Sequence, residues 1–157
     1  MQTAYIKTPL GTAEISGDEN GICKISIQSA EKEISEKIPA ELKEAVTQLR
    51  DYFKGERTDF TFRMNPSGTE FQKSVWQELI KIPYGKTVSY MDITKKLGDV
   101  KAIRAVASAN GKNPLWIAVP CHRVIGTDGS LTGYAGGLWR KKWLLEHESP
   151  SAQQSLF

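Results

Sequence analysis

The spacing of apolar residues changes once along the chain, and this change constrains the fold more than any other feature. Residues 1–30 divide into three short segments with turn residues between them: AYIKTPLG, TAEISGDENG and ICKISIQS. From residue 39 onwards, apolar residues recur every three or four positions. The first pattern predicts a small antiparallel sheet with a hairpin turn at residues 18–21, and the second predicts helices.

The first helical pattern covers residues 39–53, and Gly55 follows it where a C-terminal cap would lie. A further strand is expected at residues 59–64, DFTFRM, before a linker of sequence NPSG. We therefore expect residues 1–68 to form an α+β domain with its linker, a small antiparallel β-sheet plus a helix.

Residues 69–148 have the pattern of a second, mainly helical domain. Helical spacing covers residues 69–82, 88–98 and 99–114, with Asp99 as a candidate N-cap. Two short helices around Gly98 predict a helix-turn-helix, although short helical hairpins also occur in proteins that never touch DNA. A Gly-rich loop and a closing helix at about residues 139–147 complete this domain, and residues 149–157 are expected to be a flexible polar tail.

Composition narrows the classes of function. The 157 residues contain no apolar stretch long enough for a membrane span and no N-terminal signal-peptide pattern, so we expect a cytoplasmic protein. Neither of the two cysteines, Cys23 and Cys121, belongs to a CxxC pair or a zinc-ligand cluster, so no metal or disulfide is expected. Cys23 lies in the alternating segment ICKISI and is interpreted as a small buried strand residue.

The charge is unevenly divided between the two parts. Residues 1–70 carry 9 basic and 12 acidic side chains, whereas residues 71–157 carry 12 basic and 6 acidic ones. The net charges of −3 and +6 favour contact of the second part alone with a polyanion such as DNA.

The segment PCHRV, at residues 120–124, contains the candidate nucleophile Cys121 beside His122. If the segment is extended, the two side chains point to opposite faces, and a proton relay would need a bend or a bridging water. The alternative is a buried cysteine beside a structural loop histidine.

Three segments together carry a resemblance to a known family: PCHRVI, the upstream RAVASANGKNP and the downstream GYAGGLWRKKWLLEHE. With these segments the chain resembles the methylated-DNA–protein-cysteine methyltransferases, also called O6-alkylguanine-DNA alkyltransferases. The opening TPLGTAEIS is similar to the family's N-terminal domain. The resemblance implies an RNase H-like first domain, a winged-helix-like second domain, no cofactor, and repair by one irreversible transfer of an alkyl group to Cys121.

The resemblance also implies roles for the residues around Cys121. His122 would act through a water together with Glu148, and Tyr90 would donate its hydroxyl to the departing guanine. Without the resemblance, Glu148 would be interpreted as a solvated charge at a helix end. Tyr90 would be interpreted as a residue on the apolar face of its helix.

DNA would be bound through the minor groove, with the damaged base flipped out of the duplex. Arg104 would fill the gap, small neighbours such as Ala102 and Ala105 would allow close approach, and Lys101 and Lys112 would contact phosphates.

The resemblance also assigns the substrate pocket to Tyr134, to the backbones of Val124 and Ala135, and to Trp116. Ala135 replaces a hydroxyl residue and Trp116 a proline of some relatives, which leaves the accepted alkyl size open. Asn113 matches a hinge asparagine of the family, for which we expect a structural role.

The C-terminal QQSLF resembles the Gln-x-x-Leu-Phe peptides that bind the bacterial sliding clamp, although a five-residue match also arises by chance. We expect a monomer. The alternatives for function are an alkyltransferase-like damage sensor, in which Trp replaces the cysteine, a helix-turn-helix regulator, and a thiol hydrolase.

Overall fold

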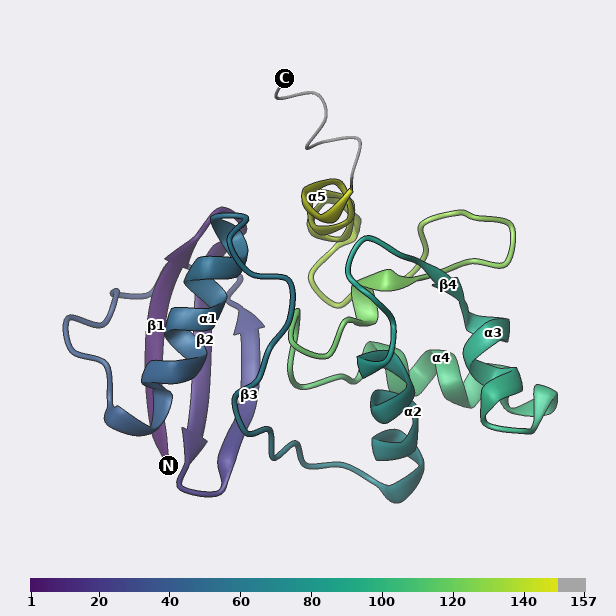
Figure 1. Cartoon of the computed structure of the whole chain (residues 1–157), viewed down its shortest axis with the longest axis horizontal. Helices are drawn as coiled ribbons and strands as arrows, with labels where there is room; N and C mark the ends of the chain where they lie inside the picture. The colour runs from purple at the N-terminus through teal and green to yellow at the C-terminus, as the bar shows by residue number, and fades with distance from the viewer. Residues whose placement is uncertain (150–157) are drawn as a thin grey trace. The chain divides into compact units, whose positions relative to one another are not determined.

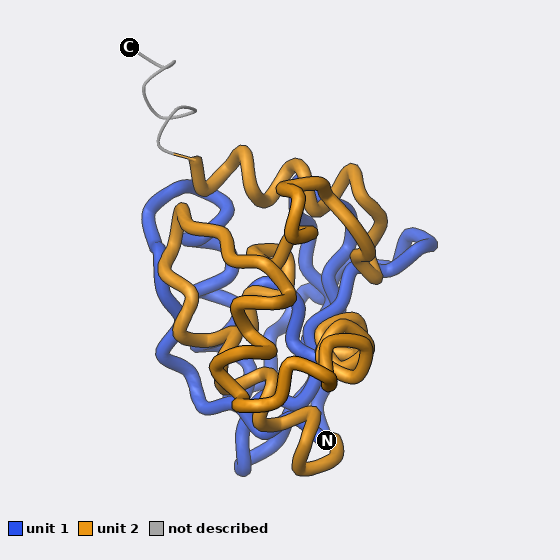
Figure 2. The backbone as a smooth tube through the Cα atoms, turned by 90° about the vertical axis from the view of Figure 1, so that its right-hand side faces the viewer, with its two compact units in different colours: residues 1–67, 114–118 blue, residues 68–113, 119–157 orange. Residues whose placement is uncertain are grey.

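The computed structural model describes residues 1–149, and the chain forms two compact units (Figure 2). The first unit comprises Met1–Ser67 together with Pro114–Ala118, and the second comprises Gly68–Asn113 together with the chain from Val119 onwards. The five residues of Pro114–Ala118 thus belong to the first unit, although the residues on both sides of them belong to the second.

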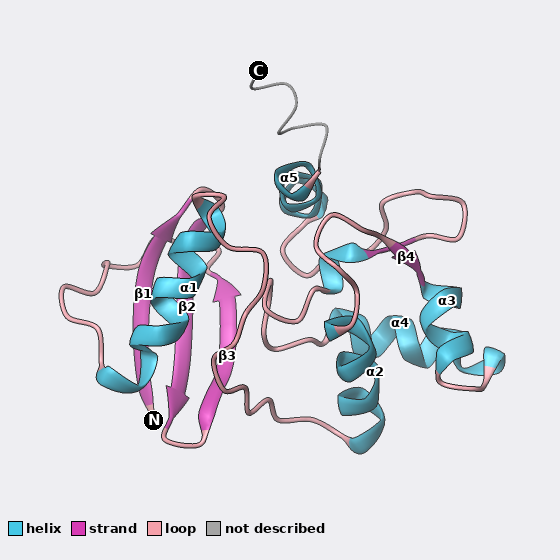
Figure 3. Ribbon diagram, in the orientation of Figure 1, coloured by secondary structure: helices cyan, strands magenta, loops and turns pink. Residues whose placement is uncertain are grey.

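The first unit is a three-stranded antiparallel sheet with one helix, as the spacing predicts (Figure 3). Strands β1 (Gln2–Thr8), β2 (Gly11–Asp18) and β3 (Gly21–Ile27) follow one another in the sheet, and Asp18 pairs with Gly21 across the expected hairpin turn. A 3₁₀ turn (Ala40–Leu42) leads into α1 (Lys43–Phe53), which lies along one face of the sheet (Figure 1). Buried isoleucines of the strands and the apolar side of α1 form the core.

The strand predicted at residues 59–64 does not form. Only Met64 bridges to Ile22 of β3, and Leu115 bridges to Ile25 further along the same strand. Two short segments therefore share this edge of β3, and neither runs beside it long enough to become a strand. Cys23 is half-buried instead of buried, and its Sγ lies 3.5 Å from the carbonyl oxygen of Ser16, where β2 carries an irregularity in its pairing.

Within the described residues the second unit is built on four helices, and the starts of two of them are encoded locally. Both α2 (Glu70–Ile80) and α3 (Tyr90–Lys96) begin with complete capping boxes, at Thr69 and Ser89. The predicted helix-turn-helix is formed by α3, a 3₁₀ turn (Val100–Ala102) and α4 (Ile103–Gly111). The last helix is α5 (Leu138–Glu148).

Two contacts hold this unit together around the helix-turn-helix. The buried indole of Trp76 donates to the carbonyl of Ala109 at 2.9 Å and thereby fixes α2 against α4. Strand β4 (Val88–Ser89) pairs in parallel with β5 (Val124–Ile125), so the chain that follows Cys121 is joined to the start of α3. None of the helices in residues 1–149 is long and apolar enough to cross a membrane.

Candidate active site

Two tight turns and a 3₁₀ turn place Cys121. Ile117 adopts a φ of 75°, unusual for a β-branched residue, and the amide of Ala118 donates to the carbonyl of Trp116 at 2.8 Å. Pro120 then forms a second three-residue turn, with the amide of Cys121 donating to the carbonyl of Val119 at 2.8 Å. Cys121–Arg123 is a 3₁₀ turn, so this segment is not extended, and it contains the bend that a relay needs.

Cys121 is buried, with 5% of its surface exposed. Burial raises the pKa of its thiol from 9.0 to about 11, although a hydrogen bond from the Asn113 side chain and the charge of Lys141 act in the opposite direction. The cysteine therefore rests as a neutral thiol near pH 7, and it must lose its proton before it can act as a nucleophile.

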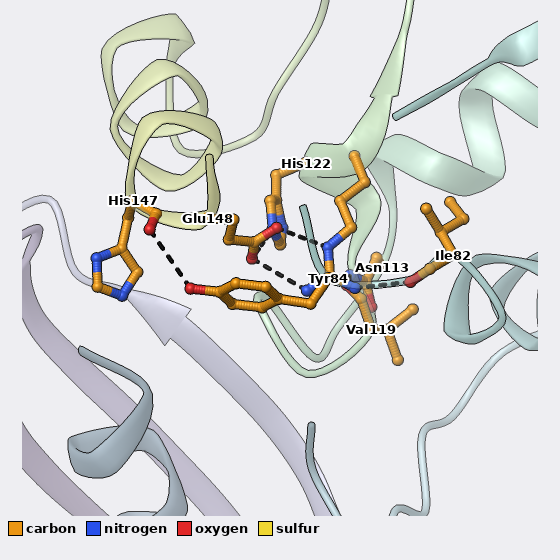
Figure 4. Close-up of polar contacts among 8 residues, drawn as sticks. Ile82, Tyr84, Asn113, Val119, His122, His147 and Glu148 are labelled. Carbon is orange, nitrogen blue, oxygen red and sulfur yellow. Dashed lines mark hydrogen bonds and ion pairs between the residues drawn. The ribbon is translucent and has the colours of Figure 1, made fainter. Parts of the chain in front are cut away.

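His122 and Glu148 meet directly in a buried ion network (Figure 4). Nε2 of His122 lies 2.8 Å from Oε2 of Glu148. The Arg123 guanidinium donates twice to the same carboxylate, from Nε at 2.7 Å and from Nη2 at 3.0 Å, and Nη1 donates to the carbonyl of Ile82 at 2.7 Å. Glu148, the last residue of α5, is thus fixed to the turn that carries Cys121.

The charges in this network favour a neutral imidazole with a defined tautomer. Burial alone would raise the pKa of Glu148, but the hydrogen bonds and charges of His122 and Arg123 outweigh it and lower the pKa to about 2. Burial also lowers the pKa of His122. An ionised Glu148 can only accept, so Nε2 of His122 carries the hydrogen and Nδ1 is left with a lone pair. Nδ1 is buried and has no hydrogen-bond partner among residues 1–149.

Asn113 and Lys141 fix the backbone on both sides of Cys121. The Asn113 amide donates to the carbonyl of Val119 at 2.8 Å and so connects the residues that precede and follow Pro114–Ala118. Lys141 is fully buried, and its Nζ donates to the carbonyls of Val124 at 2.6 Å and Thr132 at 2.7 Å.

A cavity of about 490 Å³ adjoins α4 and the Gly-rich loop. This volume is typical of small-molecule sites. Its lining residues come from α3, α4 and the loop: Tyr90, Ala107, Gly111, Thr132, Gly133, Tyr134 and Ala135. Burial raises the pKa of Tyr134 well above its ordinary value, and the charge of Cys121 raises it further.

The outer face of α4 combines small side chains with one long cation. Arg104, Ala105, Ala107 and Ser108 are exposed, whereas Val106, Ala109 and Asn110 are buried. Ala102 is half-buried, and Lys101 and Lys112 are exposed at the two ends of the helix. Because Ala107 and Gly111 also line the cavity, the helix-turn-helix surface and the cavity are continuous.

The structure thus collects most of the predicted site residues in the second unit and leaves one outside. Trp116 lies in the first unit, where its amide donates to the carbonyl of Ile25 at 3.0 Å. Sequence reasoning missed Arg123 and Lys141. Arg123 stood inside the motif PCHRV, but nothing in a linear pattern distinguishes a buried charge from a solvated one. Within residues 1–149 no cluster of three His, Cys, Asp or Glu could hold a metal ion.

Two family models together match nearly the whole chain. Residues 1–66 match the model described as the ribonuclease-like domain of 6-O-methylguanine DNA methyltransferase, and residues 70–150 match the DNA binding domain of the same protein. A methylated-DNA–protein-cysteine methyltransferase of Methanosarcina acetivorans is 45% identical over 155 residues, which cover 94% of this chain and 98% of the relative. A protein of the same name from Mycobacterium leprae is 54% identical over 113 residues, 72% of this chain and 68% of the relative.

Solved structures agree with these matches. A crystal structure of the Mycobacterium tuberculosis OGT in complex with DNA superimposes with a TM-score of 0.86 at 41% identity, covering 96% of both chains. The Mycobacterium tuberculosis O6-methylguanine methyltransferase superimposes with a TM-score of 0.83 at 38% identity, covering 99% of both chains.

Proposed function

The chain belongs to the methylated-DNA–protein-cysteine methyltransferase family, and on that premise we propose that it repairs O6-alkylguanine in duplex DNA by moving the alkyl group onto Cys121. The observation that carries this assignment is the imidazole of His122. Its Nε2 is held by an ionised Glu148, and its Nδ1 is left unpaired in the turn that contains the cysteine.

The transfer is an in-line displacement at the alkyl carbon. The thiol proton of Cys121 passes through a bridging water to Nδ1 of His122, and Glu148 stabilises the imidazolium that forms. The thiolate sulfur forms a bond to the alkyl carbon while the bond from that carbon to O6 breaks, and the electron pair leaves with guanine. The departing guanine takes a proton from the Tyr90 hydroxyl. The product is a thioether, which hydrolysis does not reverse, so each molecule reacts once.

The cavity beside α4 suits a flipped base. A guanine inside the duplex cannot reach a buried thiol, so it must be extruded, at a cost of about a few kcal/mol. Tyr134 would stack on the extruded base, and the backbones of Val124 and Ala135 would contact its edges. Tyr90 also lines the cavity, which supports its role as proton donor.

Arg104 is proposed to occupy the space that the flipped base leaves in the stack. It is exposed on α4 between small residues and makes no polar contact with the rest of residues 1–149, so its side chain is available to DNA. Binding through the minor groove implies that the protein has little preference for DNA sequence, because this groove discriminates bases poorly. A repair protein needs this property, since lesions occur in any sequence. Lys101 and Lys112 would contact phosphates on either side.

The test is the intact mass of the protein, with peptide mapping, after mixing with a duplex that contains one O6-methylguanine. We expect one methyl group per chain, located on Cys121, and restoration of unmodified guanine. The matched control is Cys23→Ser, which keeps the proposed acceptor and should take up the methyl group as the wild type does, whereas Cys121→Ser should not. Tight binding to the lesion without added mass would instead identify a damage sensor, and an absence of binding would refute both.

We propose that the protein acts as a monomer in the cytoplasm, where a reducing environment keeps Cys121 free, and that its C-terminal QQSLF binds the sliding clamp. This motif lies outside the described residues. Deletion of residues 153–157 should abolish binding to a cognate clamp while leaving methyl uptake intact, and unchanged affinity for the clamp would contradict the proposal.

A further inference from the structure

Lys141 is the one lysine among residues 1–149 whose side chain is completely buried. Transfer of an ammonium group into a protein interior costs several kcal/mol unless hydrogen bonds and an opposite charge compensate it. Two of its three hydrogens are accepted by the carbonyls of Val124 and Thr132. No carboxylate of residues 1–149 lies within ion-pair distance of it, so two hydrogen bonds hold the ammonium group and no opposite charge neutralises it.

From this arrangement we infer that Lys141 is a positioning residue for the transfer reaction. Its ammonium joins the two chain segments that flank the site, and it holds a positive charge ready for the Cys121 thiolate. The inference rests on the proposed function for the identity of the reacting group. A charge that is already in place needs no reorganisation when the thiolate forms, and in a site without water it acts more strongly than in solvent.

The contacts of Lys141 connect the segment after Cys121 with the loop that lines the cavity. Val124 follows the turn that carries Cys121, and Thr132 begins the part of the loop that lines the cavity. The carbonyl of Thr132 also accepts from the Tyr90 hydroxyl, at 3.4 Å. When Tyr90 turns to the guanine, this carbonyl keeps its bond to Lys141, so the release of the hydroxyl leaves no unpaired acceptor.

The electrostatic coupling between the two groups is reciprocal. The charge of Lys141 lowers the pKa of Cys121, against the larger effect of burial, and the charge of Cys121 raises the pKa of Lys141, which burial lowers. The other groups around the thiol are the Asn113 amide, which also lowers its pKa, Tyr134, which is neutral, and His122, whose ring bonds to Glu148. Lys141 is therefore the cation that acts on Cys121.

The test follows the pH dependence of Cys121 alkylation by iodoacetamide in the DNA-free protein, with peptide mapping to separate Cys121 from Cys23. Lys141→Met should lower the rate at about pH 8 by about tenfold, because loss of the cation raises the thiol pKa and so lowers the fraction of thiolate. Lys141→Arg should keep most of the rate. The matched control is Lys142→Met, which removes the exposed neighbouring lysine and should behave as the wild type. Equal profiles for Lys141→Met and Lys142→Met, with both variants folded by circular dichroism, would overturn the inference.

A second measurement remains available if Lys141→Met does not fold. Lys141→Gln keeps a donor for the two carbonyls but removes the charge, so its rate of Cys121 alkylation at about pH 8 should fall well below that of Lys141→Arg, which keeps the charge. Equal alkylation rates for Lys141→Gln and Lys141→Arg would contradict the coupling. Both experiments use no alkylated DNA, so they separate this inference from the proposed repair activity, which methyl uptake by the wild type tests.

Discussion

Glu148→Gln tests whether the buried network is built to leave Nδ1 of His122 free as a base. The substitution keeps the shape of the side chain but replaces one acceptor oxygen by an amide donor. In the wild type, Oε1 accepts from Nε of Arg123, and Oε2 accepts from Nη2 of Arg123 and from His122. Whichever way the amide is turned, its NH₂ group faces at least one N–H of Arg123, so one buried donor loses its acceptor.

The expected loss of stability follows from this geometry. An unpaired buried donor costs about 1–3 kcal/mol, and a buried guanidinium without its counter-charge brings the total to about 3–5 kcal/mol. The free energy of unfolding of a domain of this size is about 5–15 kcal/mol, so the variant should fold but should unfold at a clearly lower urea concentration. Tryptophan fluorescence during urea titration measures the change.

The same substitution should slow alkyl transfer for a separate reason. With its NH₂ group towards Nε2, the glutamine holds His122 in the other tautomer, in which Nδ1 carries the hydrogen and cannot take the thiol proton. We expect the single-turnover rate to fall by about 10- to 100-fold, as for other losses of a partner that orients a histidine.

The double variant Arg123→Met/Glu148→Gln separates the two effects. Removal of the unpaired guanidinium should recover part of the lost stability, because the two residues are directly coupled, whereas the transfer rate should stay low. A Glu148→Gln protein within about 1 kcal/mol of the wild type, with an unchanged transfer rate, would refute the assigned network.

Three further predictions concern other parts of the molecule. The pKa of Cys121 is raised from 9.0 to about 11, so the stability that its neutral form provides is complete below pH 9 and is lost as the pH rises towards 11. Between about pH 7 and about pH 10 the wild type should therefore lose about 1.4 kcal/mol of its free energy of unfolding relative to Cys121→Ser. Urea titrations that give the same difference in stability between the two proteins at both pH values would contradict this. Trp76→Phe should destabilise the second unit by about 1–3 kcal/mol in urea titration, because the carbonyl of Ala109 loses its buried donor and a cavity remains. Arg104→Ala should change stability by less than about 0.5 kcal/mol, since the side chain is exposed, but it should slow methyl transfer from duplex DNA much more than from a single strand, and equal slowing on both would argue against intercalation.

Much of the fold could be predicted because its signals are local. The alternation of apolar and polar residues predicted the three strands, and the spacing of apolar residues after residue 39 predicted the helices. Two of these helices start at complete capping boxes, at Thr69 and Ser89. The strand expected at residues 59–64 failed because pairing depends on the partner edge. Met64 and Leu115 share the free edge of β3, and a sequence pattern contains no information about that competition.

The residues of the candidate site could be named from the sequence, but their arrangement could not. Cys121, His122 and Glu148 come from the resemblance, and the sequence left open whether the segment at Cys121 is extended or bent. The 3₁₀ turn there follows a turn at Pro120 and a positive φ at Ile117, which no propensity favours in a β-branched residue. Tertiary contacts hold such a backbone, and a linear pattern does not record them.

Arg123 and Lys141 are the two buried charges that the sequence did not distinguish from solvated ones. Together they explain how a buried thiol with a raised pKa can still react. Glu148 and Arg123 form one ion pair, which fixes the tautomer of His122 and adds no net charge. Lys141 adds one positive charge that lowers the pKa of the Cys121 thiol. The site therefore holds a base that becomes positive when it takes the proton, and a cation already placed for the thiolate. Burial keeps Cys121 mostly protonated near pH 7, which slows its reaction with other electrophiles in a protein that we propose reacts only once.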